Sequence, residues 1–144
     1  CLLLRPPKEV GLDDPEMPSI FAQFLAALGG EVVPFPYQAE CCGAYLAVTA
    51  QEAAVDATRR VLEAAGKAGA ELLAVSCPLC HYNLDSKQEE IAANQPGYSP
   101  LPVVYFSQLL AVALSLGEEL CRFDGQQVDP RPALRRRNLI GVGA

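Results

Sequence analysis

Five of the six cysteines in this 144-residue chain follow a pattern suited to binding a metal. They are Cys1, the adjacent pair Cys41 and Cys42, and the C-x-x-C pair Cys77 and Cys80. Thiolates are soft ligands, so a convergent set of them selects iron–sulfur clusters, zinc or copper(I) over hard cations. Adjacent cysteines do not easily form a disulfide with each other, because the small ring violates normal disulfide geometry. We therefore interpret the pair as two ligands of one metal centre.

The number of thiols bears on which metal is bound. Five cysteines exceed the four ligands of a tetrahedral zinc site, so the pattern favours an iron–sulfur cluster, with zinc and a metal-free dithiol as the alternatives. A thioredoxin-like role for Cys77 and Cys80 is disfavoured, because the chain has no Trp and the adjacent pair would then be unexplained. Cys121 stands outside the pattern and is predicted to be a structural thiol. His81, the only histidine, is either a hydrogen-bond partner or proton donor to a cluster, or a residue making a local helix bond.

Composition indicates one globular domain. Hydrophobic residues make up 51% of the chain and charged residues 19%, which is an ordinary balance for a folded protein. A net charge of -6 argues against nucleic-acid binding, because no basic surface would neutralise phosphates. No uninterrupted apolar run is long enough to span a membrane. The Ala- and Leu-rich helical runs favour a reducing cytoplasm over a secreted disulfide scaffold.

The chain starts at Cys1 rather than at a methionine. A lipidated cysteine at the start of a mature lipoprotein is one explanation, but the apolar residues Leu2–Leu4 follow at once, without a polar tether. We therefore expect a fragment of a longer polypeptide, in which a strand leads into Cys1.

The spacing of apolar residues predicts alternating helices and strands. Helices are expected over residues 19–28, 49–65, 80–93 and 107–116, the second opened by a capping box from Thr49 to Glu52. Strands are expected over residues 31–35, 71–76 and 101–106. This order predicts an α/β fold with a doubly wound, mainly parallel sheet flanked by helices. We expect a domain of residues 1–123 and an extended tail over residues 124–144.

The cysteines are expected at the carboxyl ends of strands, where open parallel sheets bind ligands. Cys41 and Cys42 follow the strand expected at 31–35, and Cys77 follows the strand expected at 71–76 directly. Pro78 suits the first turn of a helix, whose N-terminal partial charge stabilises thiolates. Gly43 either supplies a positive φ or lets the backbone approach a cluster closely.

Three segments carry a resemblance to a known family. Cys1–Pro6, Cys41–Gly43 and Cys77–Asp85 resemble the cysteine-rich CCG domain of the heterodisulfide reductase B-subunit family, and most closely its second repeat. The resemblance implies that Cys1, Cys41, Cys42, Cys77 and Cys80 bind a noncubane 4Fe-4S cluster. It further implies disulfide reduction or electron transfer within a multi-subunit oxidoreductase, with an iron–sulfur or flavin subunit as partner and a disulfide as substrate.

The resemblance leaves a second function open. CCG domains of similar proteins, among them subunits of glycolate oxidase and of an unusual succinate dehydrogenase, include some that are thought to hold zinc. A zinc-stabilised interaction domain is therefore the alternative. Gly43-Ala44-Tyr45 also differs from the glycine-rich run of the methanogen enzymes, which argues against the coenzyme heterodisulfide as the substrate.

Overall fold

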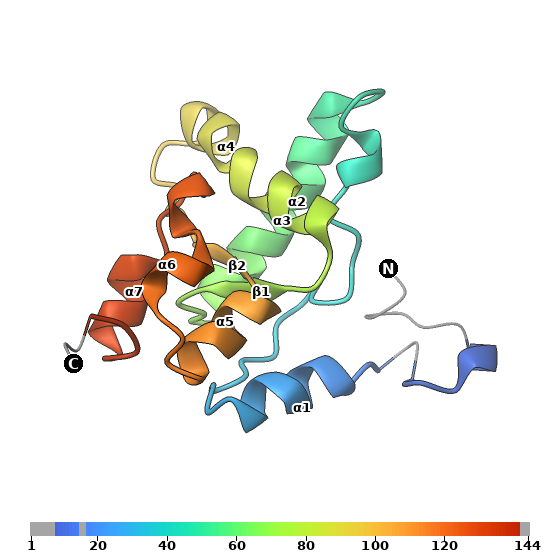
Figure 1. Ribbon diagram of the computed structural model, residues 1–144. Helices are drawn as coiled ribbons and strands as arrows, with labels where there is room; N and C mark the ends of the chain where they lie inside the picture. The colour runs from blue at the N-terminus through green and yellow to red at the C-terminus, as the bar shows by residue number, and fades with distance from the viewer. Residues whose placement is uncertain (1–7, 15–16, 142–144) are drawn as a thin grey trace.

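The computed structural model describes residues 8–14 and 17–141. Its centre is a two-stranded parallel sheet of β1 (Leu73–Val75) and β2 (Val103–Tyr105), in which Leu73 pairs with Val103 and Val75 with Tyr105. Helices cover both faces of this sheet (Figure 1). The predicted α/β class with a parallel sheet between helices is confirmed.

The sheet separates two hydrophobic cores, because side chains along a strand alternate between its faces. One core joins Leu73, Val75 and Val103 to α2 (Gln51–Lys67), α3 (Pro78–Ser86) and α4 (Gln88–Asn94). The other core joins Val104 to α5 (Phe106–Ala113), α6 (Glu118–Cys121) and α7 (Arg131–Arg136). Short 3-10 turns occupy Lys8–Val10, Ala44–Leu46 and Phe123–Gly125.

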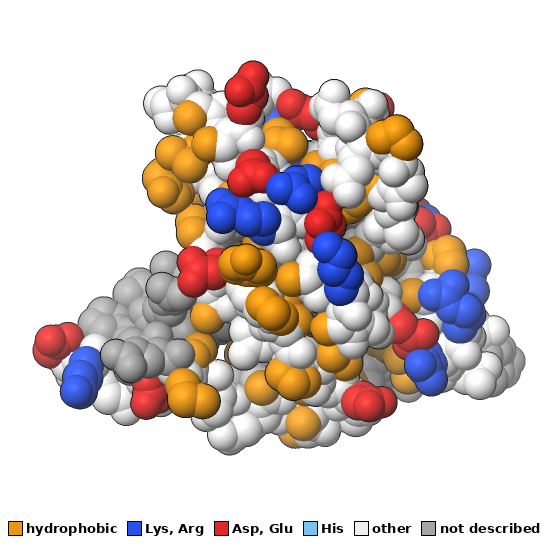
Figure 2. Space-filling view, turned by 180° about the vertical axis from the view of Figure 1, so that it is seen from behind, with side chains coloured by type: hydrophobic (Ala, Val, Ile, Leu, Met, Phe, Trp, Pro, Cys, Tyr) orange, Lys and Arg blue, Asp and Glu red, His pale blue; other side chains and the backbone are white. Residues whose placement is uncertain are grey.

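Helix α2 has the amphipathic character that its sequence predicts. Its buried face consists of Ala54, Thr58, Val61, Leu62 and Ala65. Its outer face carries ion pairs one turn apart, including Arg59 with Asp56 and with Glu63. On the face of the molecule seen in Figure 2, basic and acidic side chains accordingly lie next to each other. The predicted capping box is wrong: the helix begins at Gln51, and its N-terminus has no side-chain cap.

The strand predicted at residues 31–35 is wrong, since this segment has no regular structure. Pro34 has no N–H to donate to a strand ladder and Pro36 follows closely, so the β-branched pair Val32-Val33 cannot propagate pairing. Helix α1 (Ile20–Ala27), predicted at 19–28, lies beside the body in Figure 1. Phe21 and Phe24 of α1 make edge-to-face ring contacts with Phe106.

Two further predictions need correction. The helix predicted over 80–93 is two helices, because α3 ends and α4 begins at Lys87. The segment predicted as an extended tail includes α7, whose Leu134 is buried against Phe123. This segment is also fastened to α3, because Asp85 accepts hydrogen bonds from the backbone N–H groups of Gln127 (2.7 Å) and Val128 (3.1 Å). The boundary at residue 123 itself stays a prediction.

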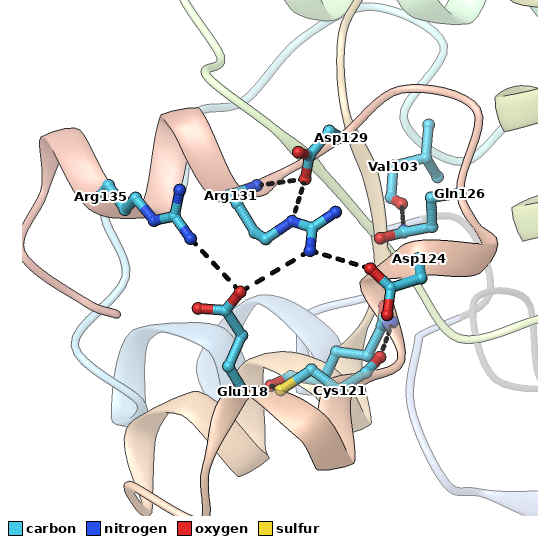
Figure 3. Close-up of polar contacts among 9 residues, drawn as sticks. Val103, Glu118, Cys121, Asp124, Gln126, Asp129, Arg131 and Arg135 are labelled. Carbon is cyan, nitrogen blue, oxygen red and sulfur yellow. Dashed lines mark hydrogen bonds and ion pairs between the residues drawn. The ribbon is translucent and has the colours of Figure 1, made fainter. Parts of the chain in front are cut away.

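Ion pairs join α7 to α6 on the surface (Figure 3). The Arg131 guanidinium contacts the carboxylates of Asp124 (2.9 Å), Asp129 (2.8 Å) and Glu118 (3.8 Å). Arg135 reaches Glu118 as well, at 3.4 Å. In the described part of the chain, no helix combines the length and the apolar character that crossing a bilayer requires.

Candidate metal centre

Two cysteines from distant motifs meet at the edge of the sheet. The sulfur atoms of Cys42 and Cys80 lie 3.3 Å apart, although the residues are 38 positions apart in the sequence. Cys42 is buried, with 3% of its surface exposed, and Cys80 is half-buried. The adjacent pair therefore contributes one member, Cys42, to the sulfur–sulfur contact, and its partner comes from the C-x-x-C motif.

Cys77 and Cys80 occupy the start of helix α3, as the sequence predicts. Cys77 is the N-cap residue with extended backbone angles, Pro78 stands in the first turn, and the Cys77 carbonyl accepts the N–H of His81 at 3.0 Å. Proline costs little here, because the first turn of a helix has no partner for its N–H. Strand β1 ends two residues earlier, at Val75, so both thiols lie at the carboxyl end of a parallel strand.

The loop that carries Cys42 is fixed by a buried polar contact. Asn83 donates its side-chain amide to the Cys42 carbonyl (2.7 Å) and to the Thr58 hydroxyl (2.8 Å), and Thr58 donates to the same carbonyl (3.1 Å). Asn83 follows Cys80 by three positions, so both side chains project from one face of α3. Helix α3 thus supplies one thiol and positions the other.

Gly43 explains the third letter of the CCG motif. Its φ of +82° lies in the left-handed region that glycine favours. A Cβ atom at this position would meet the Cβ of Ala57 at 3.0 Å and the Cα of Ala54 at 3.1 Å. The positive φ expected from the sequence is present, and the close approach in the structure is to helix α2, whereas an approach to a cluster stays a prediction.

The contact shifts the pKa values of the two thiols in opposite directions. The hydrogen-bonded contact with Cys80 lowers the pKa of Cys42 to about 6. The same contact, together with burial, raises the pKa of Cys80. One proton between two sulfur atoms accounts for both shifts, since the second thiolate would form beside the first.

The other predicted ligands lie around this pair. Cys77 lines a cavity of about 50 Å³ together with Cys42 and Cys80. Cys41 is exposed, and its sulfur accepts the N–H of Gly43 at 3.4 Å. Cys1 lies outside the described residues. In residues 8–14 and 17–141, no three Cys, His, Asp or Glu side chains form a ready-made ion site.

The His81 ring makes long-range contacts, while its backbone N–H makes the local helix bond to Cys77. Its ring stacks on Tyr105 with centroids 4.3 Å apart, and its Nε2 lies 3.0 Å from the side-chain nitrogen of Gln126. Burial lowers the pKa of His81, which favours the neutral ring. Burial, and to a lesser extent the charges of Cys77 and Cys80, raise the pKa of Tyr105, which pairs with Val75 at the end of β1, two residues before Cys77.

Cys121 lies in the other core. It is buried with Phe123 and Leu134, and its sulfur is 3.8 Å from the Gln108 carbonyl and 3.9 Å from that of Gly117. All five described cysteines are free thiols. The structural role expected for Cys121 agrees with this position.

Sequence reasoning missed three residues around the cysteines: Thr58, Asn83 and Tyr105. A signal existed for Asn83, since its spacing of three from Cys80 places it on the same face of a helix. Thr58 stands among the apolar residues of the α2 stripe, where a hydroxyl needs a buried partner. Tyr105 only becomes adjacent through the pairing of β2 with β1, which no local pattern encodes.

The thiols suit a soft metal. Two sulfur ligands of one tetrahedral ion lie about 3.8 Å apart when each is about 2.3 Å from the metal. The 3.3 Å between Cys42 and Cys80 therefore needs only a small expansion to admit an ion. The lowered pKa of Cys42 further supplies a thiolate, the form that binds metals.

Residues 1–85 match the family described as the cysteine-rich domain CCG. The chain is 34% identical over 116 residues to the 8-methylmenaquinol:fumarate reductase membrane anchor subunit of Wolinella succinogenes, covering 81% of this chain and 41% of that protein. It is 33% identical over 124 residues to the B subunit of the ferredoxin:CoB-CoM heterodisulfide reductase of Methanosarcina mazei. This match covers 83% of this chain and 40% of that protein.

A second Methanosarcina species has a protein with a similar match. The corresponding B subunit of Methanosarcina acetivorans is 32% identical over 124 residues, again with 40% of its length covered. The chain thus spans about two fifths of the length of these curated relatives. The match over residues 1–85 includes all five cysteines of the motif, and the chain belongs to the family of cysteine-rich CCG domains.

Proposed function

We propose that this domain binds an iron–sulfur cofactor through Cys1, Cys41, Cys42, Cys77 and Cys80, as part of a cytoplasmic redox subunit. The observation that carries the proposal is the 3.3 Å contact between Cys42 and Cys80. It joins the CCG motif to the C-x-x-C motif at the carboxyl end of β1, where ligands of parallel sheets gather. The cluster is proposed to be a 4Fe-4S cluster, of the noncubane type.

The relatives support a role in electron transfer or disulfide reduction. One carries the name of a heterodisulfide reductase subunit and another that of a fumarate reductase subunit, so both names describe parts of redox complexes. By extension, other subunits with iron–sulfur or flavin centres are the proposed partners, and a disulfide is the proposed substrate class. A bound cluster would supply the one-electron chemistry, which the protein itself does not provide.

The residues of the chain have separate tasks in this proposal. Cys42 and Cys80 bind the cofactor, and Asn83 holds the Cys42 backbone in place. His81 follows Cys80 in α3, and its ring stacks on the half-buried Tyr105. Backbone N–H groups at the start of α3 favour negative charge on the sulfur atoms.

Metal analysis of protein purified without oxygen tests the proposal. Iron and acid-labile sulfide at several atoms per chain, with a broad visible absorption, are expected. Cys42→Ser and Cys80→Ser should each lose most of the iron, whereas Cys121→Ser should keep it, because Cys121 belongs to the other core. Trace iron and sulfide in the parent chain after anaerobic reconstitution would refute the proposal.

One observation favours a second candidate, a structural zinc ion. The cavity beside Cys42, Cys77 and Cys80 measures about 50 Å³, which suits about one or two water molecules or a single ion. A cluster of four irons and four sulfides needs the loops to move apart. Stoichiometric zinc in a colourless protein, lost on Cys80→Ser together with thermal stability, would identify this alternative.

A further inference from the structure

The contact between Cys42 and Cys80 also has consequences for the domain without its metal. We propose that in the metal-free domain these two thiols form a reversible dithiol–disulfide couple that competes with cofactor binding. This inference goes beyond the proposed function and does not depend on which metal is bound. It concerns a covalent bond between two side chains of the chain itself.

Distance is the first support for the couple. The sulfur atoms are 3.3 Å apart, and a disulfide bond is about 2.05 Å long, so closure requires a shift of little more than an ångström. Both residues are free thiols, and both line the same small cavity, which leaves room for that shift. Closure therefore requires no refolding.

The rigidity of the two attachments is the second support. Cys80 belongs to the first turn of α3, and Cys42 is fastened to the same helix through Asn83 (2.7 Å) and to α2 through Thr58 (3.1 Å). Gly43 then packs directly on α2, so the loop cannot swing away without losing these contacts. Fixed neighbours react faster than flexible ones, because their effective concentration is high.

The C-x-x-C partner Cys77 is the obvious competitor for Cys80. It is the N-cap residue, with φ −101° and ψ 127°, whereas Cys80 is inside the helix. Cys77 also interacts with Cys80 and contributes to its raised pKa, but less than Cys42 does, and the 3.3 Å sulfur–sulfur contact is the one to Cys42. The geometry therefore favours pairing between motifs over pairing within the C-x-x-C.

The oxidation is balanced by a low-molecular-weight disulfide such as oxidised glutathione. Cys80, the more exposed of the two, gives its proton to the Cys42 sulfur 3.3 Å away as it attacks one sulfur of that disulfide, which forms a mixed disulfide and releases one molecule of thiol. The buried Cys42 then attacks the Cys80 sulfur and releases the second thiol. Two electrons pass from the protein to the small disulfide, and the two thiol protons end on the two released thiols.

The oxidation state of Cys42 and Cys80 would then control whether the cofactor can be loaded. While Cys42 and Cys80 are joined, neither can bind a metal as a thiolate. Reduction restores both thiols at once, and Asn83 still holds the Cys42 backbone in place. The disulfide would thus protect both ligands from irreversible oxidation after cofactor loss.

The test uses the full chain, stripped of metal, reduced and then equilibrated in glutathione redox buffers. Samples are quenched with an alkylating reagent, and the disulfides are mapped by mass spectrometry of the peptides, with circular dichroism recorded on each sample. The expected product links Cys42 to Cys80. Cys41→Ser and Cys77→Ser should change the equilibrium constant less than about threefold, and Cys42→Ser or Cys80→Ser should abolish the product.

A positioning variant adds a kinetic readout. Asn83→Ala should slow formation of the Cys42–Cys80 bond about tenfold, because the loop is released, whereas Asn94→Ala, on the exposed surface of α4, should not. A dominant Cys77–Cys80 or Cys41–Cys42 bond, mixed disulfides alone, or an unfolded metal-free chain would overturn the proposal. Binding of Zn²⁺ or Fe²⁺ is measured separately, so a chain that forms the disulfide but binds neither metal contradicts only the proposed function.

Discussion

Asn83 and Cys42, 41 positions apart in the sequence, are joined by a hydrogen bond of 2.7 Å from the side-chain amide of Asn83 to the Cys42 carbonyl. The same amide donates to Thr58, and the Asn83 side chain is 1% exposed. Through this bond helix α3, which carries the C-x-x-C motif, fixes the position of the CCG loop. The contact thereby links the stability of the domain to the geometry of its thiols.

Removing this link should affect both properties. Asn83→Ala leaves the buried Cys42 carbonyl with only the Thr58 hydroxyl, and is expected to cost about 1–3 kcal/mol of unfolding free energy and most of the bound metal. Asn83→Asp keeps the size of the side chain but removes the donor, so it should cost more. Urea denaturation and metal analysis measure the two effects.

The control for this prediction is Asn94→Ala. Asn94 donates to the Glu90 carbonyl from an exposed position on α4. Its replacement should therefore leave the unfolding free energy and the metal content nearly unchanged. Equal behaviour of the Asn83 and Asn94 variants would contradict the role of Asn83.

Gly43→Ala should be much more harmful than another glycine substitution with the same backbone strain. Gly97 has φ +87° and open space around it, so Gly97→Ala is expected to cost about 1 kcal/mol from the left-handed backbone alone. In Gly43→Ala the new methyl group also overlaps Ala54 and Ala57 on α2. This overlap is expected to cost about 1–3 kcal/mol of unfolding free energy in addition to the backbone strain. Comparison of the two denaturation curves isolates the packing effect, and equal losses would show that the contact with α2 is unimportant.

Helix α7 should be held by its apolar side chain rather than by its ion pairs. Leu134 is 1% exposed, so Leu134→Ala is expected to cost about 2–5 kcal/mol. Arg131→Ala should cost about 1 kcal/mol or less, and less still in high salt, because its partners are at the surface (Figure 3). Leu120→Ala, on the exposed side of α6, is the apolar control. A larger loss from Arg131→Ala than from Leu134→Ala would reverse this assignment.

Tyr98 should be the last tyrosine to ionise in an alkaline titration followed by the ultraviolet absorption of the phenolate. Burial raises the pKa of Tyr98 to about 12, and its hydroxyl donates to Gln88 at 2.9 Å. The raised pKa means that the folded state favours the neutral phenol. Its contribution to stability is therefore complete below about pH 10 and is lost as the pH rises through about 12.

The matched variants for this titration are Tyr98→Phe and Tyr82→Phe. The first should remove the step near pH 12, and the second, at an exposed side chain, should leave that step in place. Titration of all five tyrosines in one step near pH 10 would contradict the burial of Tyr98.

The sequence alone determined the fold class, the place of helix α2 in the chain, and the position of Cys77 and Cys80 at a strand-to-helix junction. These features arise from local patterns: apolar spacing, proline in the first helical turn, and a buried apolar strand. The same local reasoning failed at residues 31–35, where two prolines outweigh β-branched residues, and at residues 124–141, where burial of Leu134 orders a segment of weak pattern.

Tertiary structure decided which sulfur atoms meet. The sequence shows the cysteine spacing, but the pairing of Cys42 with Cys80 depends on the parallel sheet, on the packing of Gly43 against α2 and on the hydrogen bond from Asn83. Each of these joins residues far apart along the chain, and contacts of that kind form only once the whole core has assembled. For this reason Asn83 and Thr58, which position a cysteine of the CCG motif, emerged from the structure.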